Sequence, residues 1–129
     1  MEHNLYNMFS NIKNSLAVKK SYMYHLKNNI CIGVLNVLWD EGFINGFKVC
    51  LKKKMFLKIF LRYNKNIPVI SLLKTISKPG KRVHLNNKSI WKLDDSLGLF
   101  ILSTDKGVLS LTKCKELNIG GELICYVQE

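Results

Sequence analysis

A short polar turn in the last third of the chain holds the residues best suited to bind a sugar–phosphate ligand. Ser103-Thr104-Asp105-Lys106-Gly107 follows directly on the apolar run 99–102. Hydroxyls, backbone N–H groups and a lysine are donors that bind ribose and phosphate oxygens. Because the turn has no aromatic side chain to stack on bases, it suits recognition of the shape and 2′-hydroxyls of folded RNA. An ordinary solvated hairpin turn would fit the same residues, and on the turn alone both interpretations stay open.

Two further segments could make contacts of the same kind. In Gly120-Gly121-Glu122, paired glycines allow close backbone approach, and the carboxylate could accept hydrogen bonds from base amino groups or ribose hydroxyls. The plainer interpretation is a helix stop followed by a charge on an edge strand. Ser77-Lys78-Pro79-Gly80-Lys81-Arg82 places three cations around a rigid turn, which indicates phosphate contact or a solvated linker.

Catalytic and metal-binding motifs are not visible in the sequence. Asp40-Glu41 and Asp94-Asp95 are adjacent pairs, whose side chains point apart on a helix or a strand. No histidine stands in a nucleophile motif, and the eight dispersed glycines form no phosphate-binding loop. The four cysteines lack CxxC spacing and are expected to be buried thiols rather than zinc ligands or disulfides. We therefore expect no enzymatic activity, no cofactor, no metal and no small-molecule substrate.

The composition favours a polyanionic partner. Twenty Lys and Arg against nine Asp and Glu give a net charge of +11 on 129 residues, and 47% of the residues are hydrophobic. Such a charge repels itself and is most easily sustained when a polyanion neutralises it. Nucleic acid is the first candidate, an anionic membrane surface the second, and simple solubility the plain alternative. With no secretory pattern and no run approaching the ~20 apolar residues of a membrane span, we expect a soluble protein.

The helices and strands predicted from the sequence, which must position these candidate residues, form an α+β fold of two small lobes. Apolar residues at helical spacing predict a helix over residues 5–16, and Asn28 or Asn29 caps a second helix that Gly42 ends. A short strand is predicted near 22–24, and three longer strands over 43–51, 55–63 and 69–76, with a bulge at Gly46 and a charged turn at 52–54. Residues 1–76 are thus predicted to form an N-terminal α/β sandwich of two helices and three strands.

Residues 77–129 are predicted to form a mostly-β C-terminal lobe with one short helix, after the breaker Pro79-Gly80. Ser110 is expected to cap that helix, which runs through about Leu117, and Gly120-Gly121 to stop it. The predicted strands are 82–84, 90–92, 99–102, 108–109 and 122–127.

Four of these motifs, in this order, resemble the S-eight family of small-subunit ribosomal proteins. The resemblance extends from Leu5 to Val127. Residues 38–44 resemble the family's Leu-x-x-Glu-Gly-Phe-Ile, and residues 77–82 its Ser-Arg/Lys-Pro-Gly-x-Arg. Residues 103–108 resemble its Ser-Thr-Ser-x-Gly signature, and residues 120–126 its C-terminal strand.

The resemblance implies a structural protein of the small ribosomal subunit that binds the central domain of its ribosomal RNA early in assembly. The implied protein neighbours are small-subunit proteins five, twelve and seventeen. A module that binds an acidic protein, and a regulator that binds a messenger RNA mimic of the ribosomal site, stay open as alternatives. The implied RNA-binding residues are Ser103, Thr104, Lys106, Gly107, Gly120, Gly121 and Glu122, with Ser10, Lys13 and Asn14 in the first helix. To these we add Lys78 and Arg82 of the basic turn as phosphate contacts, and His84 as a ring that could stack on a base.

The chain departs from the family pattern at several positions. Asp105 stands where the family has a second serine, His84 where an aromatic residue is usual, and Asn11 where an arginine is usual. The abundant Lys, Asn, Ile, Leu, Phe and Tyr all have A/T-rich codons. Together these features favour a mitochondrially encoded copy, with a plastid or the cytoplasm of an A/T-rich bacterium as alternatives.

Overall fold

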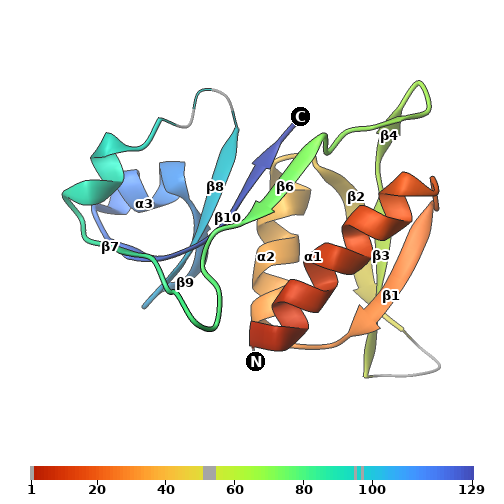
Figure 1. Ribbon diagram of the computed structural model, residues 1–129, viewed down its shortest axis with the longest axis horizontal. Coiled ribbons are helices and arrows are strands. Elements are labelled where there is room, and N and C mark those ends of the chain that lie inside the picture. Colours follow the sequence, from red (N-terminus) through yellow and green to blue (C-terminus); the bar gives the residue numbers. More distant parts are fainter. Residues whose placement is uncertain (1, 51–54, 95, 97) are drawn as a thin grey trace. The chain divides into compact units, whose positions relative to one another are not determined.

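A computed structural model describes residues 2–50, 55–94, 96 and 98–129. The chain divides into two compact units, Met1–Ser71 and Leu72–Glu129. The first unit combines helices and strands and the second is mostly β with one α-helix (Figure 1), which confirms the predicted α+β class. None of the described helices has the length and apolar character needed to cross a bilayer.

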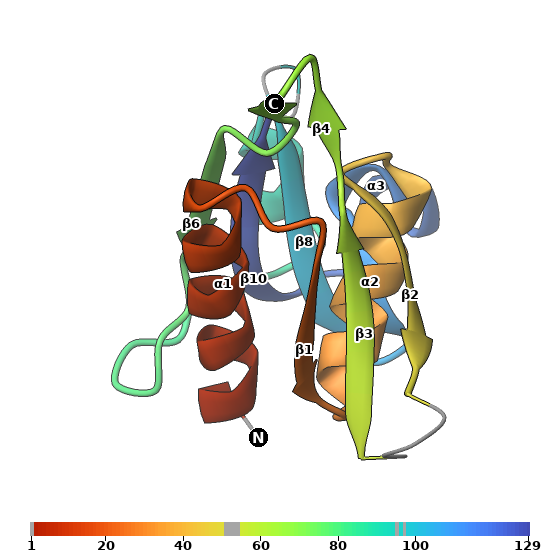
Figure 2. The same ribbon diagram turned by 90° about the vertical axis from the view of Figure 1, so that its right-hand side faces the viewer.

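The N-terminal unit is a three-stranded antiparallel sheet with two helices packed on one face (Figure 2). The strand order is β1-β3-β2. The elements are α1 (Glu2–Ala17), β1 (Tyr22–Leu26), α2 (Asn29–Asp40), β2 (Ile44–Val49) and β3 (Phe56–Leu61), followed by the small hairpin β4 (Tyr63–Asn64) and β5 (Ile67–Pro68).

Hydrophobic periodicity builds this unit as expected. The apolar residues of α1 that recur at helical spacing, Leu5, Met8, Phe9, Ile12 and Leu16, are all buried. In β3 every second residue is buried, so one face of the strand joins the core. Asn28 caps α2 by accepting a hydrogen bond from the backbone N–H of Ile30, and Gly42 follows the helix with a φ of +80°. The predicted bulge is confirmed by a register shift between Ile44 and Gly46.

The C-terminal unit is an antiparallel sheet in the order β6-β10-β8-β9, with β7 also pairing with β10. An apolar cluster of Ile90, Leu102, Leu111, Cys114 and Leu123 lies between one face of the sheet and the two short helices. The elements are β6 (Leu72–Thr75), β7 (His84–Leu85), the 3-10 helix η1 (Ser89–Lys92), β8 (Leu99–Thr104), β9 (Gly107–Ser110), α3 (Leu111–Leu117) and β10 (Gly121–Gln128).

Two predicted strands differ from the structure. The run at 69–76 gives β6, which pairs with β10 of the second sheet instead of joining the first sheet. The run at 90–92 is the helical turn η1, because the Asn86 side chain accepts from the backbone N–H groups of Lys88 and Ser89, at 3.0 and 2.7 Å, and bends the chain. The predicted charged turn at 52–54 lies outside the described residues.

One other strand, and the residue that stops α3, also differ from the prediction. The strand expected over 82–84 is instead His84–Leu85. Ser110 caps α3 and the helix runs to Leu117, both as predicted, but the residue that caps its end is Asn118, which has a φ of 54°. Asparagine adopts this left-handed conformation more readily than most residues, so the helix stops before the glycines.

His25 joins α1 to β1 inside the N-terminal unit. Its Nε2 lies 2.9 Å from the carbonyl oxygen of Asn4, and its Nδ1 lies 3.3 Å from Nδ2 of Asn11. A neutral ring with the proton on Nε2 satisfies both contacts, since it donates to the carbonyl and accepts from the amide. Burial lowers the pKa of His25 from its ordinary value of 6.5, against a smaller opposing effect of the hydrogen bond to Asn4.

The lowered pKa of His25 predicts a loss of stability in mild acid. Below about pH 6.5 the unfolded chain takes up a proton that the folded chain resists, so the free energy of unfolding falls as the pH falls. His25→Gln keeps a donor and an acceptor without titrating, and its thermal unfolding should lose less stability between neutral pH and mild acid than that of the wild type. Equal pH dependence in wild type and His25→Gln would contradict the assignment.

Candidate nucleic-acid interface

The β8–β9 hairpin holds the predicted Ser-Thr turn in one conformation. Thr104 pairs with Gly107 across the hairpin, and Asp105 and Lys106 form the turn between them. The Thr104 hydroxyl donates to the carbonyl of Gly107 at 2.8 Å and accepts from the backbone N–H of Lys106 at 3.1 Å. Gly107 has a φ of +106°, a conformation that favours glycine. Thr104 and Gly107 therefore shape the turn that presents Lys106.

Ser103, Glu122 and His84 lie side by side on three neighbouring strands. Glu122 of β10 pairs directly with Ser103 of β8 on one side and with His84 of β7 on the other. Side chains of directly paired residues point to the same face of a sheet. Val83 and Leu85, the neighbours of His84, pack against the apolar cluster under α3, so His84 and its row face the other way. We call these three residues the polar row.

An ion pair neutralises the carboxylate in this row. Arg82 donates from Nη1 to Oε1 of Glu122 at 3.1 Å, and the side chain of Glu122 is only 17% exposed. A lone glutamate would repel a phosphate backbone, and the guanidinium beside it offsets that repulsion. The pair also ties the segment before β7 to β10. The structure thus brings four predicted residues, Arg82, His84, Ser103 and Glu122, into one patch.

The two glycines before Glu122 serve close packing between strands. A Cβ on Gly120 would overlap the carbonyl oxygen of Leu85, and a Cβ on Gly121 would overlap that of Ser103. The interpretation of this segment as a helix stop was wrong, because α3 has already ended at Asn118. The interpretation of Glu122 as a charge on an edge strand was also wrong, since β10 lies inside the sheet.

A second turn presents lysines next to the patch. Lys78 and Lys81 exchange two backbone hydrogen bonds of 2.9 Å around Pro79-Gly80, and both lysines are exposed. Ser77, which is 2% exposed, donates to the carbonyl of Leu123 and accepts from the N–H of Val83 at 3.0 Å. Sequence reasoning did not assign Ser77 this anchoring role, because serine side chains are mostly exposed in folded proteins.

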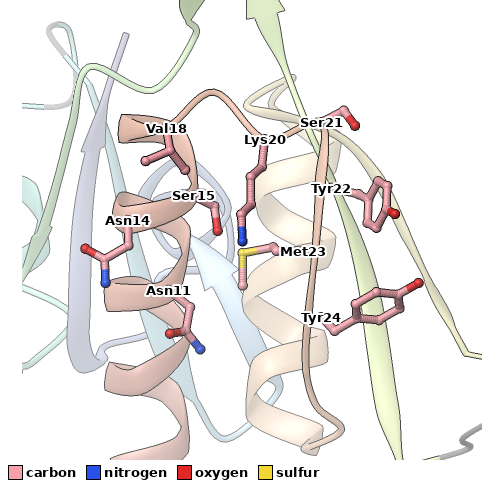
Figure 3. A pocket seen from close by; sticks show the side chains of 9 residues that line it. All are labelled: Asn11, Asn14, Ser15, Val18, Lys20, Ser21, Tyr22, Met23 and Tyr24. Atoms are coloured by element: carbon pink, nitrogen blue, oxygen red, sulfur yellow. The ribbon is translucent and has the colours of Figure 1, made fainter.

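The predicted residues of the first helix lie on its exposed side in the N-terminal unit. Ser10, Lys13 and Asn14 are all exposed. Asn14 also lines a groove of about 770 Å³ between α1 and β1 (Figure 3). Asn11, Ser15, Val18, Lys20, Ser21 and the β1 residues Tyr22, Met23 and Tyr24 complete the lining. Amides, hydroxyls and a lysine beside a strand give this groove donors suited to a sugar–phosphate chain.

Three of the four cysteines are buried in the protein interior. Each of the four is a thiol; Cys31, Cys114 and Cys125 are buried as expected, whereas Cys50 is partly exposed. Burial raises the pKa of Cys31 to about 11 and also raises that of Cys114 and Cys125, so these thiols stay protonated and unreactive at neutral pH. Within the described ranges, no three His, Cys, Asp or Glu side chains gather closely enough to hold a metal ion.

The chain is thus a small basic α+β protein with a patch of polar and charged side chains on its C-terminal sheet. Residues 3–128 match the family model described as "Ribosomal protein S8". The chain belongs to this family, as its motifs indicated, and the family is one of structural, non-enzymatic proteins.

Individual relatives match over almost the whole chain. The "Small ribosomal subunit protein uS8" of Blochmanniella pennsylvanica is 34% identical over 128 residues, covering 98% of each chain. That of Alcanivorax borkumensis is 38% identical over 127 residues, again covering 98% of each. The "Small ribosomal subunit protein uS8c" of Phaeodactylum tricornutum is 37% identical over 123 residues, covering 93% of each.

Gly121 and Gly80 provide a matched test of the packing at the patch. Gly121→Ala forces a methyl group against the Ser103 carbonyl and should lower the free energy of unfolding by about 1–3 kcal/mol. Gly80→Ala meets no atom within 4 Å and should change it by less than about 0.5 kcal/mol. Urea unfolding of the two variants measures the difference. Similar values for both would mean that the approach of β10 to β8 does not constrain residue 121.

Proposed function

We propose that this protein is a structural constituent of the small ribosomal subunit that binds the central domain of its ribosomal RNA directly. Family membership supports the structural ribosomal role. The observation that carries direct RNA binding is the polar row, which aligns a hydroxyl, a carboxylate and an imidazole on three adjacent strands beside a constrained turn. Such a set of short polar groups suits ribose hydroxyls and base edges of a folded RNA.

The cations around the row suit the phosphate backbone. Lys106 lies at the tip of the β8–β9 hairpin, and Lys78 and Lys81 flank the Pro79-Gly80 turn. Contacts of this kind set position and orientation, while the hydroxyl and carboxylate contacts discriminate among sites. Gly107, Gly120 and Gly121 contribute by letting the backbone adopt the shape that the row requires. The net charge of +11 supports the same partner.

We assign the first helix a second RNA contact through Ser10, Lys13 and Asn14. The proposed protein neighbours are small-subunit proteins five, twelve and seventeen, and the proposed role includes support of subunit assembly. The proposed compartment is the mitochondrial matrix, on the A/T-rich composition; bacterial and plastid relatives keep the two alternatives open.

Ser103→Ala tests the row directly. Among the described residues the Ser103 hydroxyl has no hydrogen-bond partner, so its loss should leave the protein fold intact and an RNA group unpaired. Binding to the central-domain RNA helix should weaken by about 1–3 kcal/mol in a filter-binding titration. Ser89→Ala removes a hydroxyl from η1, where the chain packs toward the apolar cluster, and should leave RNA affinity unchanged.

A scrambled RNA helix and two salt concentrations complete that titration. A preference for the central-domain helix that survives the higher salt supports site-specific binding. Equal binding of both RNAs that collapses with salt would show that only the net charge acts, and would overturn the proposal.

Thr104→Val should act by another route. The Thr104 hydroxyl holds the turn, so its loss should lower both the RNA affinity and the melting temperature. Ser103→Ala should lower the affinity alone. Melting curves recorded beside the RNA titrations separate the two effects. A lower melting temperature for Ser103→Ala would contradict the assignment that its hydroxyl makes no hydrogen bond within the described part of the protein.

A further inference from the structure

The outer face of the N-terminal sheet, away from α1 and α2, carries aromatic and basic side chains in register. Tyr22 pairs directly with Phe60, and Tyr24 with Lys58. Met23, which lies between the two tyrosines, is 6% exposed, whereas Tyr22 and Tyr24 are 43% and 49% exposed. Figure 3 shows both tyrosine rings on the side of β1 that points away from α1, with Met23 pointing toward the helix. The rings are therefore presented outward.

Lys58 stands at the centre of these rings. Its Nζ lies 4.2 Å from the ring centroid of Tyr22, 5.3 Å from that of Phe60 and 6.0 Å from that of Tyr24. The two tyrosine rings contact each other edge to face, with centroids 5.7 Å apart. Contacts between a cation and several ring faces hold the ammonium group beside the aromatic surface.

A second lysine lies directly opposite the first. Lys48 of β2 pairs with Lys58 of β3, and its Nζ lies 5.9 Å from the ring of Phe60. Like charges directly opposite each other destabilise a sheet, and neither lysine has an ion-pair partner among the described residues. A pair of this kind is relieved when an anion binds across it. We call Tyr22, Tyr24, Lys48, Lys58 and Phe60 the aromatic platform.

We propose that the aromatic platform binds unpaired RNA nucleotides. The bases stack on the exposed rings of Tyr22 and Tyr24, and Lys48 and Lys58 neutralise the phosphates that connect them. A sheet face that offers aromatic rings to unstacked bases is an established way of binding single-stranded RNA. An acidic protein segment without aromatic residues would use the lysines alone, whereas a nucleotide strand uses the cations and the flanking ring faces together. This surface differs in chemistry from the polar row and does not depend on the function proposed for it.

The test uses the full-length protein and a fluorescently labelled RNA of alternating A and C, about eight nucleotides long, which cannot pair with itself. In fluorescence anisotropy, the double variant Tyr22→Leu/Tyr24→Leu should bind this RNA about 5- to 100-fold more weakly than the wild type. Tyr22→Phe/Tyr24→Phe keeps the rings and should bind like the wild type. Circular dichroism and melting curves confirm that both variants are folded, as expected for exposed positions.

Charge and stacking are separated by an abasic oligonucleotide of the same length. It should bind the wild type more weakly than the RNA does, and the leucine variant should no longer distinguish the two. Lys58→Gln should reduce the salt dependence of RNA binding, with a slope of log affinity against log salt smaller by about 0.7 for one phosphate contact.

Three results would overturn the proposal. One is equal RNA affinity in the wild type and the leucine variant, and another is equal affinity of the wild type for the RNA and the abasic strand. The third is equally tight binding of a glutamate-rich peptide, which would make this face a docking surface for an acidic protein. The double-leucine variant should keep its affinity for the central-domain helix, and Ser103→Ala should keep its affinity for the short RNA. The proposals for the two surfaces can therefore be confirmed or overturned independently.

Discussion

The pairing of β10 with three neighbouring strands is the constraint on which the C-terminal unit depends. β10 forms backbone ladders with β6, β7 and β8, and its side chains reach the apolar cluster under α3 through Leu123. Ser77 adds a buried hydrogen bond to the same strand. Because Gly120 and Gly121 lack a Cβ, the backbones of β7 and β8 can close on the start of β10. The polar row exists because these three strands meet in register at that point.

Around the C-terminal patch, the basic charge is placed where it costs the fold little. The lysines around the patch are exposed at tight turns, where water or a ligand screens them. The carboxylate of Glu122, which is mostly shielded from water, has Arg82 beside it. On the outer face of the N-terminal sheet, by contrast, Lys48 and Lys58 face each other across two strands. The charge of Glu122 is balanced by Arg82, whereas no acidic side chain among the described residues pairs with Lys48 or Lys58. This difference supports the proposal that an anionic ligand binds at the two lysines.

In the β8–β9 hairpin, two neighbouring hydroxyl side chains have different roles. Ser103 and Thr104 are neighbours with similar side chains, and by sequence both are candidates for RNA contact. In the structure the Thr104 hydroxyl is used inside the turn, between Gly107 and Lys106, while Ser103 lies in the polar row. The Thr104 hydroxyl therefore constrains the turn, whereas the Ser103 hydroxyl belongs to the polar row.

The sequence by itself determined the fold class, the helices α1, α2 and α3, the central strands and the family. Helical and alternating periodicity, the caps at Asn28 and Ser110, and motifs at fixed spacing are local features that the chain carries without its partners. Three of the four patch residues, Arg82, Ser103 and Glu122, were also candidates by sequence, since each lies in a separate short motif.

Only the tertiary structure decided which segments lie together. That β6 joins the second sheet follows from a strand pairing that periodicity does not encode. The Arg82–Glu122 pair and the row of His84, Glu122 and Ser103 join residues about 20 to 40 positions apart, whose register depends on the close backbone approach at the glycines. The physical reason is that a strand's partner is chosen by burial across the whole sheet, whereas a helix or turn is chosen by its neighbours along the chain.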